Sequence, residues 1–192
     1  MPDSFSPPVL ETPRLLLAGH EPSDFEPLSE MWAEPAVVKH IFAGKPSPRR
    51  DSWMRMLAYR GLWPLLGYGY WSVREKTSGR YVGDLGFADF HRNMTPSVRG
   101  IPEAGWALAP WAHGQGFATE GLAAALGWLD RQENIDRSVC LISPANLASI
   151  RVAGKAGYNE SQGVVLNDRP SLLFTRMRLS ACPPAGAGET VR

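Results

Sequence analysis

The spacing of hydrophobic residues divides the first part of the chain into a strand-like and a helix-like segment. The run RLLLA at residues 14–18 follows a proline and predicts a first strand. Ser23 and Glu26 have the spacing of a capping box. Apolar residues at helical intervals follow them, so we expect a first helix that ends near residue 33.

A second helix and a hairpin are predicted next. Ser-Pro at residues 47–48 marks the helix start, because proline suits the first helical position. Trp53 and Leu57 are four positions apart and are expected to form the inner face of this helix. Two β-like segments follow at residues 67–75 and 80–90, joined by Lys-Thr-Ser-Gly, and this pattern predicts a hairpin.

Strands and helices alternate in the rest of the chain. The segment EAGWALA at residues 103–109 reads as a strand that ends at a proline. After a glycine turn, apolar residues recur at i, i+3, i+4 and i+7, which predicts an amphipathic helix. The remaining predicted elements are a strand at 138–142, a helix at 146–156 that Gly157 ends, and strands at 158–166 and 172–179. The predicted order βααβββαβαββ indicates an α/β fold with a mixed sheet.

Composition fits one globular domain. The chain has 192 residues, of which 44% are hydrophobic and 20% are charged. Residues 1–9 read as a loose arm, residues 10–180 as the domain, and residues 181–192 as a flexible tail. The formal net charge of +1 argues against nucleic acid or an anionic membrane as a partner.

The cysteines, the N-terminal segment and the most apolar stretch bear on the expected location of the protein. The two cysteines, Cys140 and Cys182, do not have CxxC spacing, and we therefore expect a cytoplasmic location. The N-terminal segment lacks the basic and apolar regions of a signal peptide. The most apolar stretch, residues 57–71, is interrupted by charge, proline and glycine, so we do not expect it to span a bilayer.

The candidate chemistry begins with the segment WAHGQGFATEGL, at residues 111–122. Gly114 and Gly116 stand just before a predicted helix, where four unpaired N–H groups and a partial positive charge favour an anion. A plain turn is the alternative interpretation. The Walker pattern is absent, and the Rossmann pattern fails because Thr119 replaces its third small residue.

Three separated motifs resemble one family, the GNAT N-acetyltransferases. His113–Ala118 is similar to the acyl-CoA signature R/Q-x-x-G-x-G/A, although histidine replaces the usual first residue. The strings ETPRLLL, GWALAPWAHGQGFATEG and NLASIRVAGKAGY resemble the RimJ/RimL-like branch, which acetylates ribosomal proteins. The likeness covers about residues 10–180. It implies the GNAT fold: a mixed, mostly antiparallel sheet of about seven strands flanked by about four helices.

The resemblance also implies the cofactor and its site. Acetyl-CoA would be the cosubstrate, with its pyrophosphate on the backbone amides of the glycine turn and its pantetheine arm between the fourth and fifth predicted strands. Asn146 and Ser149 match the family's N-x-x-S motif, and Arg151 and Lys155 are candidates for the 3′-phosphate. The cofactor-binding residues that the resemblance assigns are Ala107, Leu108, Ala109, His113, Gly114, Gln115, Gly116, Ala118, Thr119, Asn146 and Ser149.

Catalysis of acetyl transfer to an amine needs a base, an oxyanion donor and a way to protonate the leaving thiolate. Glu103 is the base that the resemblance favours, acting through water, and Asp84 and Asp89 are rivals. The backbone N–H of Leu108 is the candidate oxyanion donor. Ser149 is the candidate for the thiolate, because Ala153 stands where many relatives have tyrosine.

The acceptor is not specified by the sequence. It is expected to be a small-molecule amine or a protein N-terminus, in a pocket formed by the helices near residues 23–60 and by segment 159–170. The alternatives are a non-catalytic acyl-CoA binder and an unrelated phosphate-binding module. A monomer or a homodimer is expected. The four histidines share no ligand spacing, so no metal is expected.

Overall fold

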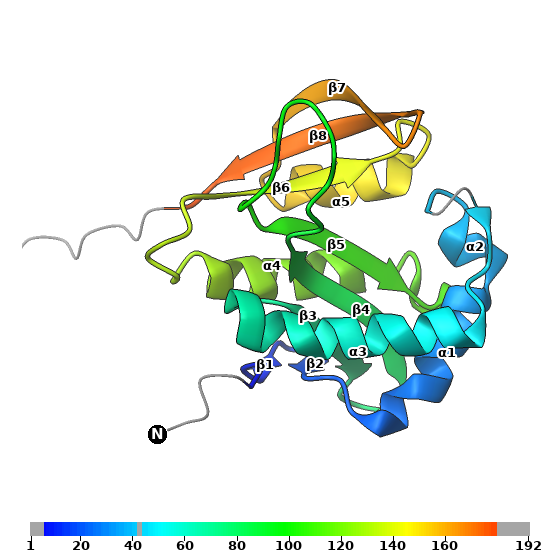
Figure 1. Ribbon diagram of the computed structural model, residues 1–192. Coiled ribbons are helices and arrows are strands. Elements are labelled where there is room, and N and C mark those ends of the chain that lie inside the picture. The colour runs from blue at the N-terminus through cyan, green and yellow to red at the C-terminus, as the bar shows by residue number, and fades with distance from the viewer. Residues whose placement is uncertain (1–5, 42–43, 180–192) are drawn as a thin grey trace, which may run out of the picture.

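The computed structural model describes residues 6–41 and 44–179, and the predicted tail at 181–192 lies outside them. Within these residues the chain forms one eight-stranded sheet in the order β1-β2-β3-β4-β5-β6-β8-β7 (Figure 1). The strands are β1 (Leu10–Glu11), β2 (Leu15–Ala18), β3 (Tyr70–Glu75), β4 (Tyr81–Ala88), β5 (Glu103–Leu108), β6 (Arg137–Ile142), β7 (Glu160–Leu166) and β8 (Arg169–Met177). All neighbouring pairs are antiparallel except β5 and β6.

Helices cover both faces of the sheet. They are α1 (Phe25–Ala33), α2 (Pro35–Val38), α3 (Arg49–Leu66), α4 (Phe117–Leu129) and α5 (Leu147–Lys155). Figure 1 shows α3 in front of the sheet and α4 behind it. The apolar face of α4, with Leu122 and Leu126, packs in the main core with Leu15 and Leu85. Burying each such side chain stabilises the fold by about 1.5–3 kcal/mol.

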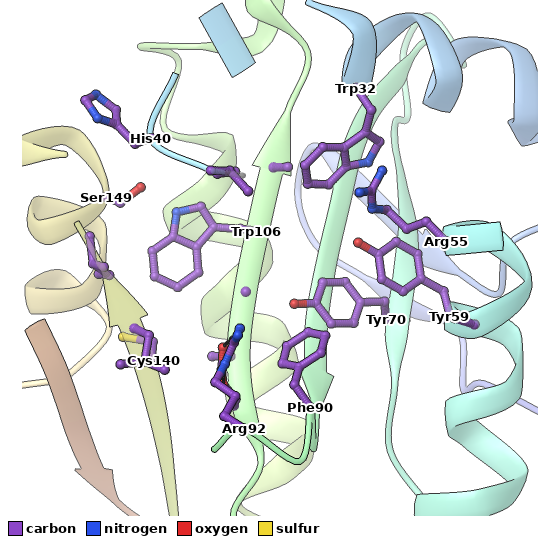
Figure 2. Close-up of a pocket in the computed structure, with 18 of the residues that line it drawn as sticks. Trp32, His40, Arg55, Tyr59, Tyr70, Phe90, Arg92, Trp106, Cys140 and Ser149 are labelled. Atoms are coloured by element: carbon purple, nitrogen blue, oxygen red, sulfur yellow. Dashed lines mark hydrogen bonds and ion pairs between the residues drawn. The ribbon is translucent and has the colours of Figure 1, made fainter. Parts of the chain in front are cut away.

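The parallel strands β5 and β6 share fewer paired residues than any other neighbouring strands of the sheet. Only Glu103 and Val139 are paired in register between these strands. The two strands separate beyond this pair, which leaves a gap between β5 and β6 toward the C-terminal end of β5 (Figure 2). The predicted α/β architecture is confirmed, and the structure adds the short strand β1 and the short helix α2.

The start of α1 differs from the prediction. The capping box is formed by Glu21 and Asp24 around a short 3-10 turn, and not by Ser23 and Glu26. The Asp24 carboxylate accepts a hydrogen bond from the Glu21 N–H at 2.8 Å and also pairs with Arg74. The capping box therefore begins two positions before Ser23, and α1 begins at Phe25.

The inner face of α3 was also predicted wrongly. Trp53 and Leu57 are 39% and 45% exposed, and the buried positions are Ser52, Met56, Tyr59 and Trp63. Because α3 carries apolar side chains on more than one side, spacing alone does not identify the side that meets the sheet. The helix ends at Gly67, whose left-handed conformation (φ 76°) requires glycine or a similarly tolerant residue.

Segment 159–170, predicted to shape the acceptor pocket, forms most of the β7–β8 hairpin instead. Asn167 and Asp168 both have positive φ, 50° and 58°, as a two-residue hairpin turn requires. The hairpin lies at the edge of the sheet beyond β6 (Figure 1). None of its described residues lines either of the cavities that we describe below.

All five tyrosines are buried, and we therefore expect the protein to unfold at high pH. Burial is the largest cause that raises the pKa of each phenol, to about 12 for Tyr68. Each raised pKa supplies stability below pH 10 that is lost as the pH rises, because the unfolded state ionises first. The loss is about 1.4 kcal/mol per tyrosine for each pH unit above 10. We expect cooperative unfolding between pH 10 and 12.

The measurement is tyrosinate absorbance recorded together with circular dichroism over this pH range. The two signals should change together, because the phenols ionise when the fold opens. Tyrosinate absorbance that rises near pH 10 while the dichroism stays native would contradict this expectation.

Of the helices in the described ranges, none combines the length and apolar character needed to cross a bilayer.

Candidate active site

The glycine turn has the geometry that the sequence predicted. Gly114 and Gly116 have φ of 73° and 81°, which side chains other than glycine rarely adopt. Gly116 is the N-cap of α4, and no side chain caps the first turn of this helix. The helix N-terminus is thus presented to solvent without a capping group, an arrangement that suits a bound anion. We call residues 113–116 the glycine loop.

Arg14 holds the glycine loop from outside, a role that sequence reasoning missed. Its Nη1 donates to the Gln115 carbonyl at 2.9 Å, and its Nε donates to Glu120 at 2.6 Å. The guanidinium lies over the Phe117 ring, 4.5 Å from the centroid. Because C=O and N–H of one peptide point in opposite directions, the bond to Gln115 directs the Gly116 N–H away from Arg14.

Two cavities lie beside the β5–β6 gap. The loop cavity, of about 550 Å³, is lined by the glycine loop, the start of α4 and part of α5. The α3 cavity, of about 560 Å³, is lined by α3, β5 and the start of the β4–β5 connection. Six residues line both cavities and define their junction: His40, Ile41, Trp106, Ala107, Asn146 and Ser149. Figure 2 shows Trp106 extending from β5 toward β6 and Ser149.

Most of the predicted cofactor residues line the loop cavity. They are Ala107, Leu108, His113, Gly114, Gly116, Ala118, Thr119, Asn146 and Ser149, together with Arg151 and Lys155. Gln115 and Ala109 are absent from the described lining. Gln115 donates its side-chain amide to the Trp111 carbonyl at 2.6 Å. His113 places Nε2 2.8 Å from the Leu108 carbonyl, so it links the glycine loop to β5.

The direction of the β5 backbone corrects part of the predicted pantetheine site. The Ala109 N–H donates to the Val82 carbonyl at 2.8 Å, so Ala109 faces β4. In an antiparallel pair, the backbone N–H and C=O groups of successive residues point alternately to the two sides of the strand. Those of Ala107 therefore face β4 as well. The backbone groups of Trp106 and Leu108 point the other way, toward the gap. The side chain of Trp106 lines both cavities.

Asn146 and Ser149 meet at the first turn of α5. The Asn146 side chain accepts a hydrogen bond from the Ser149 N–H at 3.1 Å, so Asn146 caps the helix. Both side chains still line the two cavities. Tyr158 lines neither cavity: it is buried, and its hydroxyl lies 2.8 Å from that of Ser138.

Glu103 is buried at the wall of the α3 cavity and is paired with Arg92. The Arg92 guanidinium donates to both carboxylate oxygens, at 2.6 and 2.7 Å. Glu103 is 5% exposed, so it is not a solvent-facing strand-end carboxylate. It lies five residues before Leu108, roughly 16 Å along the strand at about 3.3 Å per residue. The Glu103 carboxylate is therefore remote from the backbone of Leu108.

The rival carboxylates have structural roles. Asp84 is fully buried and pairs with His20 at 2.6 Å, with the Trp32 indole at 3.0 Å and with the Tyr81 hydroxyl. Asp89 accepts bonds from the His91 and Gly100 N–H groups and thereby shapes the β4–β5 connection. Neither residue lines the α3 cavity or the loop cavity.

Cys140 and Tyr70 contribute protonated side chains to the α3 cavity. Burial, and next the Glu103 carboxylate, raise the pKa of the Cys140 thiol and that of the Tyr70 phenol. Tyr70 was missed from the sequence, yet a Cβ on Gly105 would overlap its hydroxyl. An isolated glycine inside a strand signals such a close approach, so Gly105 in EAGWALA could have indicated this contact.

No group of three or more His, Cys, Asp or Glu side chains among the described residues is arranged to hold a metal ion.

Comparison with known proteins points to one family. The model of the acetyltransferase (GNAT) domain matches residues 14–159. The uncharacterized protein YkkB of Bacillus subtilis is 30% identical over 113 residues, which are 57% of this chain and 63% of that protein. A solved structure from Bordetella pertussis, described as a GNAT-family acetyltransferase, is 30% identical. It has a TM-score of 0.76 and covers 88% of this chain and 99% of its own.

More distant structures share the fold. Spermidine N-acetyltransferase from Vibrio cholerae, in complex with CoA and spermine, is 16% identical. Its TM-score is 0.67, and the match covers 87% of this chain and 97% of that one. The ribosomal-protein acetyltransferase RimL, in complex with coenzyme A, is 17% identical with a TM-score of 0.69 and covers 88% and 98%. At this distance the likeness shows the fold alone and does not assign the chain to the RimJ/RimL-like branch.

Proposed function

The chain belongs to the GNAT acetyltransferase family, and from this premise we propose that it transfers acetyl from acetyl-CoA to a primary amine. The amine belongs to a small molecule or to a protein N-terminus, and it attacks the thioester directly in a ternary complex. The observation that carries this proposal is the meeting of two cavities at one junction beside the glycine loop. One cavity suits the cosubstrate and the other the acceptor.

The loop cavity has the features that coenzyme A requires. The pyrophosphate would lie on the amides of Gly114, Gly116 and Ala118, at the uncapped N-terminus of α4. Hydrogen bonds from amides to charged oxygens contribute roughly 1.5–3 kcal/mol each. The pantetheine arm would lie in the β5–β6 gap against the backbone of Trp106 and Leu108. Distant relatives were solved in complex with coenzyme A, which supports this cosubstrate.

The transfer itself would take place at the junction. A neutral amine attacks the thioester carbonyl carbon, the C–N bond forms, and the C–S bond of the tetrahedral intermediate then breaks. The Leu108 N–H, or that of Trp106 on the same side, would stabilise the oxyanion. Ser149 lies at the junction and would donate to the leaving thiolate. Glu103 would take the amine proton through water in the α3 cavity.

The experiment that tests this proposal is calorimetric titration followed by a thiol-release assay over a panel of amines. Acetyl-CoA and desulfo-CoA should bind at least about tenfold more tightly than ADP, because only they carry the arm that fills the gap. Release of free CoA with at least one amine is expected. Equal binding of ADP would favour a nucleotide module, and tight acetyl-CoA binding without release from any amine would favour a non-catalytic binder.

A further inference from the structure

The α3 cavity has an aromatic wall on its α3 side. The rings of Tyr59 and Tyr70 stack with 4.3 Å between centroids and an angle of 6° between planes. Figure 2 shows both hydroxyl groups pointing toward β5, with Phe90 next to Tyr70. Phe90 is 46% exposed although it lines the cavity. Tyr59 and Tyr70 are only 7% and 6% exposed, so Phe90 offers most of the accessible ring area, and the two tyrosines form the rigid wall beside it.

Charges in this cavity are balanced. Among the described residues that line it, the carboxylates of Asp51 and Glu103 are matched by the guanidinium groups of Arg55 and Arg92. Arg92 binds both oxygens of Glu103, and the Arg55 guanidinium lies 3.9 Å from the centroid of the Trp32 ring. A ligand with several positive charges needs a surplus of acidic groups, which this lining does not supply.

We propose that the acceptor is a small molecule with one amino group on an aromatic or bulky apolar body, and not a polycation. This inference rests on the proposed function, because it takes the α3 cavity as the acceptor site. The body would pack against the Tyr59–Tyr70 wall and Phe90, and the amino group would point to the junction. The cavity of about 560 Å³ lies within the ordinary range for small-molecule sites, about 300–1,000 Å³.

The experiment compares 2-phenylethylamine, n-butylamine and spermine as acceptors, with acetyl-CoA at saturation and thiol release as the readout. We expect kcat/KM for 2-phenylethylamine to exceed that for the other two by about 10- to 100-fold, the factor that burial of one aromatic ring provides. In parallel, each amine is titrated calorimetrically into the protein saturated with desulfo-CoA, which has no acetyl group to transfer.

Two variants test whether the preference for 2-phenylethylamine arises at the aromatic wall. Phe90→Ala should lower kcat/KM for 2-phenylethylamine about fivefold to tenfold and lower that for n-butylamine less, because a ring is lost from the wall. Leu65→Ala is the control, since Leu65 is 82% exposed near the end of α3 and lines neither cavity. It should change neither value.

The two proposals fail in different ways. Spermine or n-butylamine used as well as 2-phenylethylamine would overturn the inference and leave the acetyltransferase proposal intact. The absence of thiol release with every amine would count against the proposed function. The calorimetric titrations then still decide the inference, because preferential binding of 2-phenylethylamine supports it and equal binding overturns it.

Discussion

Replacing Gly114 with aspartate is expected to weaken acetyl-CoA binding about 100-fold, which corresponds to about 2.7 kcal/mol. Gly114 has φ +73°, and nothing lies within 4 Å of a Cβ built on it, so an aspartate side chain has room. Its negative charge would stand at the helix N-terminus, where the pyrophosphate of the cosubstrate is proposed to bind. Repulsion between these charges is the physical cause. Calorimetric titration with acetyl-CoA measures the change.

Two control variants separate charge from backbone strain. Gly100→Asp places the same side chain at φ +78°, also with nothing within 4 Å, in the β4–β5 connection away from the glycine loop. Its acetyl-CoA affinity should stay within about twofold of the parent value. Gly114→Asn is uncharged and should lose much less affinity than Gly114→Asp. Equal losses for the aspartate and asparagine variants at position 114 would mean that strain, and not an anion site, explains the effect.

The second large effect is expected for Glu103→Gln, which should lower kcat about 100-fold if this carboxylate is the base. Acetyl-CoA affinity should stay unchanged, because Glu103 lines the α3 cavity and not the loop cavity. Glutamine keeps one acceptor for Arg92 but loses the second charge-assisted bond, so the melting temperature must be recorded with the rate. Thiol release at saturating acetyl-CoA and amine gives kcat.

Asp168→Asn is the matched control, since Asp168 is an exposed carboxylate in the β7–β8 turn that lines neither cavity. Its kcat should equal that of the parent protein at a temperature where both are folded. If the Glu103→Gln variant keeps kcat within about threefold of the parent value, Glu103 is a structural partner of Arg92 and not the base. The base would then have to be sought at the junction, where His40 is the titratable side chain among the described residues.

The sequence was most informative where the signal is local. Strand, glycine loop and helix are consecutive within residues 103–129, so the position of Gly114 and Gly116 before α4 could be predicted directly. The left-handed φ of both glycines confirms that prediction. Asn146 and Ser149 were assigned by the resemblance to the family's N-x-x-S motif, and they lie together at the first turn of α5.

Long-range contacts are what the sequence did not reveal. Arg92 meets Glu103 across the β4–β5 connection, and Tyr70 reaches over Gly105 from another strand. No spacing rule links such positions, because the sheet register brings them together. Arg14 and the glycine loop are likewise about one hundred positions apart in the chain. The α3 cavity is built from such contacts, so it could not be predicted from the sequence.

The single residue pair between β5 and β6 has a consequence for the protein in the cell. If the pantetheine arm fills that gap, acetyl-CoA acts as a strand that makes the sheet continuous, and it binds the native state only. A ligand present at 100 times its Kd stabilises the native state by about 2.7 kcal/mol. The resistance of the chain to unfolding and proteolysis would then follow the supply of acetyl-CoA, so that the metabolic state sets the lifetime of the protein as well as its rate of turnover.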